Sequence, residues 1–132
     1  MGCDIHGFLQ LKFDEKFWLN KIDLGYLLNR NYTLFGALSN VRNHDNITGK
    51  VATDGFPDNP CIFNYDSNYY HSVGWFTFDD LNNFNWSQYI NFYDTDLWNS
   101  CGNSINDLYS IMKYFVDNYG KENVRCIIWY DN

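Results

Sequence analysis

One apolar run near the carboxyl end of the chain constrains the fold more than any other stretch. Residues 124–130 read Val-Arg-Cys-Ile-Ile-Trp-Tyr, and such a short, nearly continuous run is typical of a strand buried on both faces. A helix-period pattern comes before it, with Ser104 as the expected cap and Gly120 as the expected stop. The stripe consists of Ile105, Leu108, Ile111, Met112, Phe115, Val116 and Tyr119. We therefore expect a core helix followed by a strand in the middle of a sheet.

The amino-terminal stretch predicts another strand, with one buried face. Apolar side chains recur there with a two-residue period, which places them on one side of a strand. They are Ile5, Leu9, Leu11 and Phe13. Asp4 and His6 begin the polar side, two residues apart, so we expect both to project the same way and to share one metal, phosphate or polar ligand. The alternative is that the two simply hydrogen-bond each other or a loop backbone.

Shorter elements are expected between these two strands. Residues 16–19 and 61–63 could each form a short strand, and an asparagine in 29–31 could cap an amphipathic helix over residues 32–41. Residues 43–60 are rich in turn formers and predict a long, functional loop. Residues 85–102 give no clear assignment. The sequence predicts an α+β fold in one compact domain, 1–132, with one mixed or antiparallel sheet and two or three helices.

Charge and cysteine spacing exclude several classes of protein. The net charge of −7 and the scattered basic residues argue against binding of a nucleic-acid polymer. The four cysteines are far apart, without zinc-finger spacing. We find no signal segment and no run of about 18 apolar residues, so we expect a cytosolic protein with reduced thiols and no membrane partner.

Two arginines and several aromatic residues suggest a site for a nucleotide-sized ligand. Arg30 and Arg42 bracket the helix predicted over residues 32–41, and Asn31 and Asn43 beside them could add planar donors to a phosphate or a base edge. Arg42 could instead only cap helix carbonyls. Tyr69, Tyr70 and Trp75 offer stacking faces.

A second part of this site is predicted around residues 71–80. Thr77 and Asp80 fit a capping box, which places His71, Ser72 and Trp75 just before a helix amino terminus, where backbone N–H groups can meet an anion.

A metal site is the main alternative. Asp4, His6 and His71 could ligate a divalent ion, with Asp58 or His44 as a fourth ligand. Such an ion would permit phosphoester hydrolysis through an activated water.

Five segments, in order along the whole chain, carry a resemblance to a family. They are Met-Gly-Cys-Asp-Ile-His at residues 1–6, residues 30–36 with 41–43, Gly-Phe-Pro-Asp at 55–58, His-Ser-Val-Gly-Trp-Phe-Thr at 71–77, and residues 124–132. Together they resemble a family of small bacteriophage and prophage proteins. The resemblance implies a phage origin and action in the host cytoplasm, but no particular reaction. Phe56 replaces an expected leucine, and Val73-Gly74 replaces an expected histidine or serine, which weakens models with two ligands from this segment.

These observations lead to one functional hypothesis and two alternatives. We expect a phage protein that binds and sequesters a nucleotide-derived small molecule without a cofactor, similar in design to the sponges that capture host immune signals. We expect a homo-oligomer as readily as a monomer. The alternatives are a metal-dependent phosphodiesterase or nucleotide hydrolase and a protein–protein inhibitor of a host enzyme. The expected ligand-binding residues are Asp4, His6, Arg30, Arg42, Asn43, Asp58, Tyr70, His71, Ser72 and Trp75.

These residues have different expected roles. Arg30, Arg42 and the helix turn after Trp75 would hold phosphates, and Trp75 and Tyr70 would stack on the ligand. Asp4, His6 and His71 would contact its polar groups.

Overall fold

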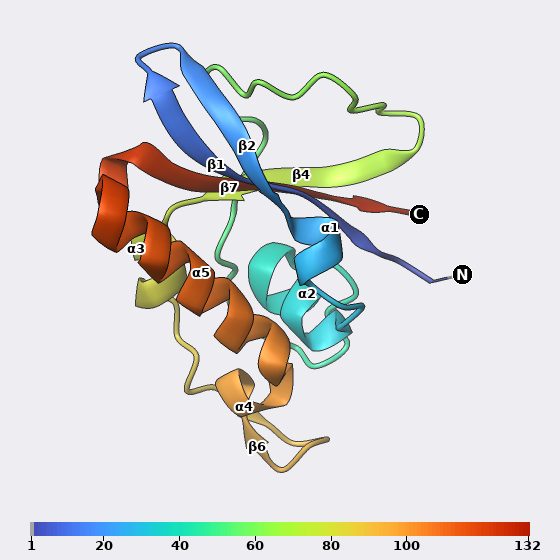
Figure 1. Cartoon of the computed structure of the whole chain (residues 1–132). Helices are drawn as coiled ribbons and strands as arrows, with labels where there is room; N and C mark the ends of the chain where they lie inside the picture. Colours follow the sequence, from blue (N-terminus) through green and yellow to red (C-terminus); the bar gives the residue numbers. More distant parts are fainter. Residues whose placement is uncertain (1) are drawn as a thin grey trace.

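The computed structural model describes residues 2–132, and its centre is a five-stranded sheet in the order β2-β1-β7-β4-β3 (Figure 1). Every neighbouring pair is antiparallel. The strands are β1 (Ile5–Asp14), β2 (Phe17–Asp23), β3 (Thr53–Asp54), β4 (Tyr70–Phe76) and β7 (Val124–Asp131). Strand β7 lies third of the five, which confirms the expected central strand. A separate hairpin pairs β5 (Tyr89–Ile90) with β6 (Thr95–Asp96).

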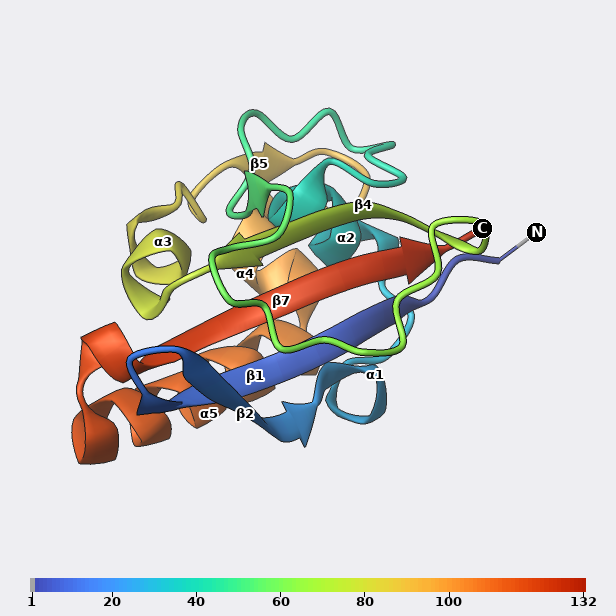
Figure 2. The same cartoon turned by 90° about the horizontal axis from the view of Figure 1, so that it is seen from above.

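The helices cover one face of this sheet, and a long loop crosses the other (Figures 1 and 2). The helices are α1 (Leu24–Leu27), α2 (Tyr32–Ser39), α3 (Phe78–Asn83), α4 (Leu97–Cys101) and α5 (Asn103–Tyr119), and a 3-10 turn η1 (Lys121–Asn123) follows. We call residues 55–69, which run over the uncovered face, the strap. The predicted α+β class is confirmed. The described chain has five helices where two or three were expected, because α1, α3 and α4 are only four to six residues long.

The core lies between the sheet and the helices. Leu9, Cys126, Ile128 and Tyr130 point from β1 and β7 towards apolar side chains of α2 and α5, and all four are fully buried. The helical side chains that meet them include Leu34, Phe35, Leu38, Ile105, Leu108 and Met112. Apolar side chains of the α5 stripe are therefore in the core, as predicted. The exception is Tyr119, which is about half exposed at the end of the helix.

Several residues begin or end helices as the sequence predicted. The Asn31 side chain accepts a hydrogen bond from the backbone N–H of Leu34 and begins α2. Thr77 and Asp80 form the expected capping box of α3. Gly120 ends α5 with φ of 92°, a conformation that favours glycine.

Other predictions at this level were wrong. Phe13 is 69% exposed rather than buried, because the pairing of β1 with β7 stops at Leu11 and the end of β1 extends past the core. Ser104 does not cap α5, which begins one residue earlier at Asn103 after Gly102. Residues 61–63 belong to the strap and form no strand, and the strand expected at 16–19 continues to Asp23.

A buried arginine fastens the strap to the sheet. Arg125 Nε donates to Gln10 Oε1 at 2.7 Å, and its two terminal nitrogens donate to the carbonyl oxygens of Asp58 and Asn59 at 2.9 and 2.7 Å. The guanidinium carbon lies 3.9 Å from the centre of the Trp18 ring. Burial lowers the pKa of Arg125 to about 10. The strap is thus held by charge-assisted hydrogen bonds to its own backbone.

Candidate functional site

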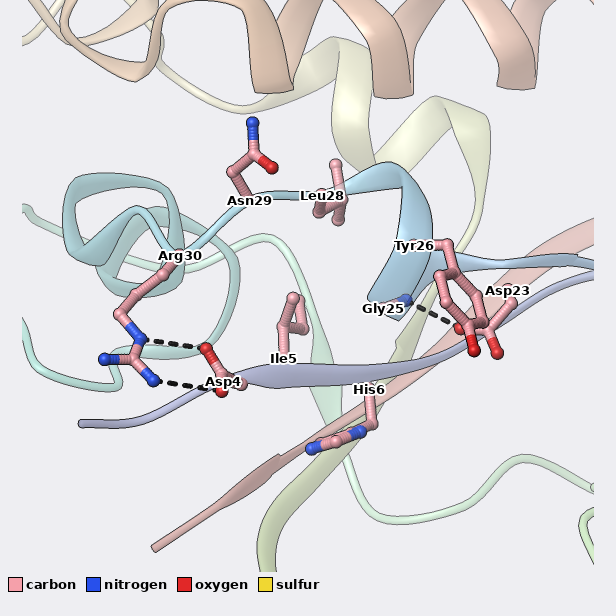
Figure 3. A pocket seen from close by; sticks show the side chains of 9 residues that line it. All are labelled: Asp4, Ile5, His6, Asp23, Gly25, Tyr26, Leu28, Asn29 and Arg30. Atoms are coloured by element: carbon pink, nitrogen blue, oxygen red, sulfur yellow. Dashed lines mark hydrogen bonds and ion pairs between the residues drawn. The ribbon is translucent and has the colours of Figure 1, made fainter. Parts of the chain in front are cut away.

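Two cavities share Arg30 as a lining residue, near the end of the sheet where the amino- and carboxyl-terminal residues lie, which we call the open end. The first, of about 460 Å³, is bordered by polar side chains from the start of β1 and from the segment around α1 (Figure 3). These side chains are Asp4, His6, Asp23, Tyr26, Asn29 and Arg30. Their mixture of acceptors and donors suits a polar ligand.

Arg30 and Asp4 form a bidentate ion pair beside this cavity. Arg30 Nε donates to Asp4 Oδ1 at 2.8 Å, and Nη2 donates to Oδ2 at 3.0 Å. Both side chains are about half exposed, and the hydrogen bond from Arg30 lowers the pKa of Asp4. A Cβ on Gly2 would lie 2.0 Å from Arg30 Nη1. Glycine at position 2 therefore allows the guanidinium to occupy this place.

The second cavity, of about 550 Å³, is also lined by Arg30. It is bordered by the amino terminus of α2, the turn after α2 and the hairpin between β5 and β6; among its lining residues are Tyr32, Arg42, His44, Phe92 and Tyr93. The Arg42 guanidinium lies over the Tyr32 ring, 5.2 Å from its centre. The cavity therefore combines two arginines with aromatic side chains.

Phe92 and Tyr93 are the residues of this cavity that sequence reasoning missed. They lie at the turn between β5 and β6, with ring centres 4.9 Å apart, and are 82% and 51% exposed. The signal was two adjacent rings between Asn91 and Asp94, both turn formers. Without an assignment for residues 85–102, that turn could not be placed beside the arginines.

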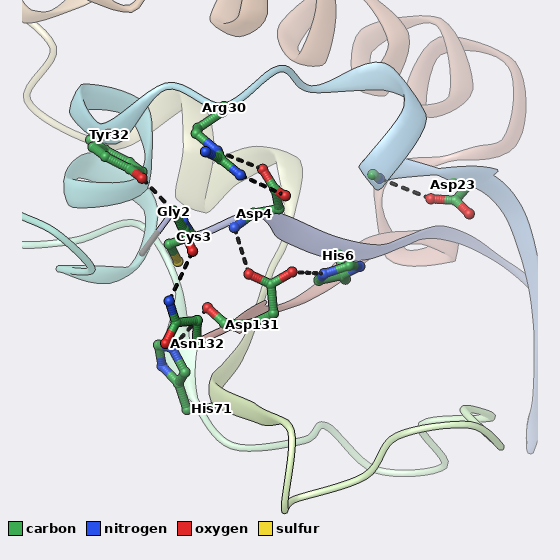
Figure 4. A network of polar contacts seen from close by, with 11 residues as sticks. Gly2, Cys3, Asp4, His6, Asp23, Arg30, Tyr32, His71, Asp131 and Asn132 are labelled. Carbon is green, nitrogen blue, oxygen red and sulfur yellow. Dashed lines mark hydrogen bonds and ion pairs between the residues drawn. The ribbon is translucent and has the colours of Figure 1, made fainter.

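The side chains of Asp4 and His6 have different partners. The Asp4 carboxylate pairs with Arg30, whereas His6 Nε2 lies 2.9 Å from Asp131 Oδ2 (Figure 4). The other oxygen of Asp131 accepts the backbone N–H of Asp4 at 2.8 Å, so the carboxylate is held in place. Both side chains nevertheless border the first cavity, so a ligand shared by Asp4 and His6 stays a prediction. The hydrogen-bonding alternative is closer, but with Asp131 as the partner of His6.

His71 is near this network through the backbone of Asp131. His71 Nε2 lies 3.3 Å from the Asp131 carbonyl oxygen, and Nδ1 lies 2.8 Å from Ser72 Oγ. In the described part of the chain, residues 2–132, no three His, Cys, Asp or Glu side chains are grouped closely enough to hold a metal ion. The predicted set of Asp4, His6 and His71 is therefore not assembled as a metal centre here.

His71 and Ser72 lie in a strand and not next to a helix. His71 and Ser72 lie at the start of β4, and α3 begins only after β4 ends at Phe76, so their expected place just before a helix amino terminus is wrong. The reason is that residues 70–76 pair with β7 as a strand instead of forming a loop.

Asp58 and Trp75 border a third cavity, of about 390 Å³, together with Trp18 and Arg125. Tyr70 instead packs on His6, with ring centres 5.2 Å apart. The amide of Asn43 bonds to Asn40 and to the backbone of Ile47, which orders the turn after α2.

Comparisons with family models, curated proteins and solved structures found no match for this chain. The site itself must therefore indicate the function. No helix within residues 2–132 combines the length and apolar character needed to cross a membrane.

Proposed function

We propose that this is a phage protein of the host cytoplasm that binds and sequesters a nucleotide-derived small molecule. The observation that carries the proposal is the second cavity, where the exposed rings of Phe92 and Tyr93 lie on the same cavity as Arg30 and Arg42. Exposed aromatic side chains beside arginines match the two halves of a nucleotide, the base and the phosphate.

The two arginines supply the phosphate half. Arginine binds phosphate through planar, bidentate hydrogen bonds and keeps its charge at every physiological pH. Arg30 pairs with Asp4, and Arg42 lies against the Tyr32 ring, so both guanidinium groups are oriented beside the cavity. The net charge of −7 does not oppose this, because the local charge of the cavity decides the binding of a small anion.

The hairpin turn supplies the base half. A base stacked on an aromatic side chain gains about 1–3 kcal/mol, and the rings of Phe92 and Tyr93 are exposed enough to offer a face. An exposed pair of rings on a cavity is also more typical of a binding site than of a stabilising core. Sequestration is proposed, rather than conversion, because of the resemblance to small phage proteins and the similarity in design to sponges.

A hydrolase is a second candidate, favoured by the pair of His6 and Asp131. Its 2.9 Å contact and the backbone hydrogen bond that holds Asp131 are the arrangement by which a carboxylate orients a histidine base. Nε2 is engaged with Asp131, so Nδ1 would be the atom that takes a proton from water. Asp4 is already paired with Arg30, so this candidate does not use the predicted metal set.

One experiment distinguishes the two candidates. The purified protein is mixed with a panel of mononucleotides, cyclic nucleotides and ADP-ribose, freed of unbound ligand and heat-denatured, and the released molecules are identified by mass spectrometry. Intact ligand released only on denaturation is the expected result, and a converted product would favour the hydrolase.

Two variants locate the ligand. Phe92→Ala should reduce retention strongly, whereas Phe63→Ala removes a ring of similar exposure, 87%, from the strap and should have no effect. No retained ligand from the whole panel would overturn the proposal and direct attention to protein partners.

A further inference from the structure

We propose that the ligand spans both cavities of the open end, with phosphates at Arg30 and a ribose beyond them in the first cavity. This inference rests on the proposed function and names the class of ligand: a base and its phosphates followed by a second sugar. ADP-ribose is the simplest soluble molecule with this composition.

Arg30 lies on both cavities and keeps hydrogen-bond donors that its ion pair does not use. Arg30 borders both cavities, and its contact with Asp4 uses Nε and Nη2. Guanidinium has five N–H donors, so the Asp4 pair does not exhaust its capacity, and Nη1 lies on the side of Gly2. A phosphate group bound to Arg30 would therefore lie where both cavities can be reached.

The charged groups that line the first cavity favour a neutral ligand group. Arg30 is the one arginine or lysine among its lining residues, while Asp4 and Asp23 place two carboxylates there. This lining is unfavourable for a second anionic group. Carboxylates do accept hydrogen bonds from ribose hydroxyls, as they do in dinucleotide-binding folds. A neutral sugar with vicinal hydroxyls is therefore the group that fits.

Asp23 and Tyr26 offer an acceptor and an aromatic ring to a sugar in the first cavity. Asp23 Oδ1 accepts the N–H of Gly25 at 2.8 Å and caps α1, which fixes the carboxylate but uses only one of about four acceptor positions. Tyr26 is 91% exposed on the same cavity, and its ring can cover the face of a bound sugar. The Asp23 carboxylate and the Tyr26 ring thus border the cavity together.

Calorimetric titration with ADP and with ADP-ribose tests the inference. Wild-type protein should bind ADP-ribose about tenfold more tightly than ADP, the gain expected for one or two hydrogen bonds to a charged acceptor. Asp23→Asn should remove most of that gain and leave ADP binding unchanged, because asparagine still caps a helix. Asp66→Asn is the matched control, since Asp66 also accepts a local backbone N–H, from Asn68, but lies in the strap.

The outcomes separate the inference from the proposed function. If ADP binds and ADP-ribose binds no more tightly, the inference is wrong and the proposed function stands. If neither binds, the inference is wrong, and the panel of nucleotides decides the proposed function separately. Tyr26→Ala is the second variant, chosen because so exposed a side chain can be removed without disturbing folding; it should also reduce the ratio of the two affinities, and an unchanged ratio in both variants would overturn the sugar site.

Discussion

Arg125 and Arg30 show how the same residue type takes different roles at two ends of one sheet. Arg125 is buried, and all three of its guanidinium nitrogens donate to neutral acceptors of Gln10 and the strap. Arg30 is half exposed, pairs with one carboxylate and borders two cavities. A cation with all its nitrogens engaged inside the protein stabilises structure, whereas a cation beside open space with donors in reserve is suited to a ligand.

The largest expected effect comes from Gly7, which lies on β1 between these two ends. Its φ is 135°, and a Cβ there would lie 2.0 Å from the carbonyl oxygen of Ile127. Gly7→Ala would therefore separate β1 from β7, the contact that both ends share. We expect a loss of at least about 3 kcal/mol in the free energy of unfolding, measured by urea denaturation. A loss below about 1 kcal/mol would show that the two strands are not packed this closely.

A matched pair of substitutions tests the comparison itself. Arg125→Met would leave the Gln10 side chain and two strap carbonyls without their donor, and should reduce the free energy of unfolding by about 3 kcal/mol. Arg30→Met should leave it nearly unchanged, because an exposed ion pair contributes little. Ligand affinity should show the opposite pattern: Arg30→Met should lose more affinity than Arg125→Met. Equal stability losses would remove the distinction between the two arginines.

Alkaline pH probes the buried side of the molecule. Burial raises the pKa of Cys101 to about 12 and also raises that of Cys126 and Tyr130. These groups stay protonated in the folded state after they ionise in the unfolded state, so their contribution is complete below about pH 8 and is lost as pH rises.

From pH 8.5 to 10, we expect the two thiols to lower the free energy of unfolding by about 3 kcal/mol. Arg125, with its lowered pKa, has the opposite sign and offsets only a little of this below pH 10. Urea denaturation across this range is the measurement, and a flat profile would contradict the burial of the thiols.

Gly2→Ala should have the smallest effect on stability. The added Cβ would displace the end of the exposed Arg30 side chain, which can move at little cost. The affinity for ADP should nevertheless fall by about fivefold, the equivalent of one hydrogen bond. In an Arg30→Met background the same change should have no further effect on affinity. An additional loss there would show that Gly2 acts by another route.

Local sequence signals predicted the elements but not their assembly at the site. The Asn31 cap, the Thr77 and Asp80 capping box and the apolar run of β7 each depend on neighbouring residues, and each is confirmed. Asp131 was missed because its contact with His6 depends on the pairing of Ile5 with Tyr130, which are 125 residues apart along the chain.

Without the pairing of the strands, the sequence could not show that Trp75 and Asp58 lie on a different cavity from Arg30 and Arg42. The two residues lie on a cavity with Arg125, whereas Arg30 lies at the open end. Phe92 and Tyr93 became candidates only when the hairpin placed them beside Arg42. Long-range pairing, rather than local propensity, decides which polar residues meet.

The most direct test of the open end as the binding site is a titration of ¹⁵N-labelled protein with ADP-ribose, followed by two-dimensional NMR. We expect the largest shifts at the backbone amides of Arg30, Arg42 and Tyr93, with the indole N–H signals of Trp18 and Trp75 unmoved. Shifts centred on those two indoles would place the ligand at the Arg125 end and contradict the account, and so would a spectrum that does not change.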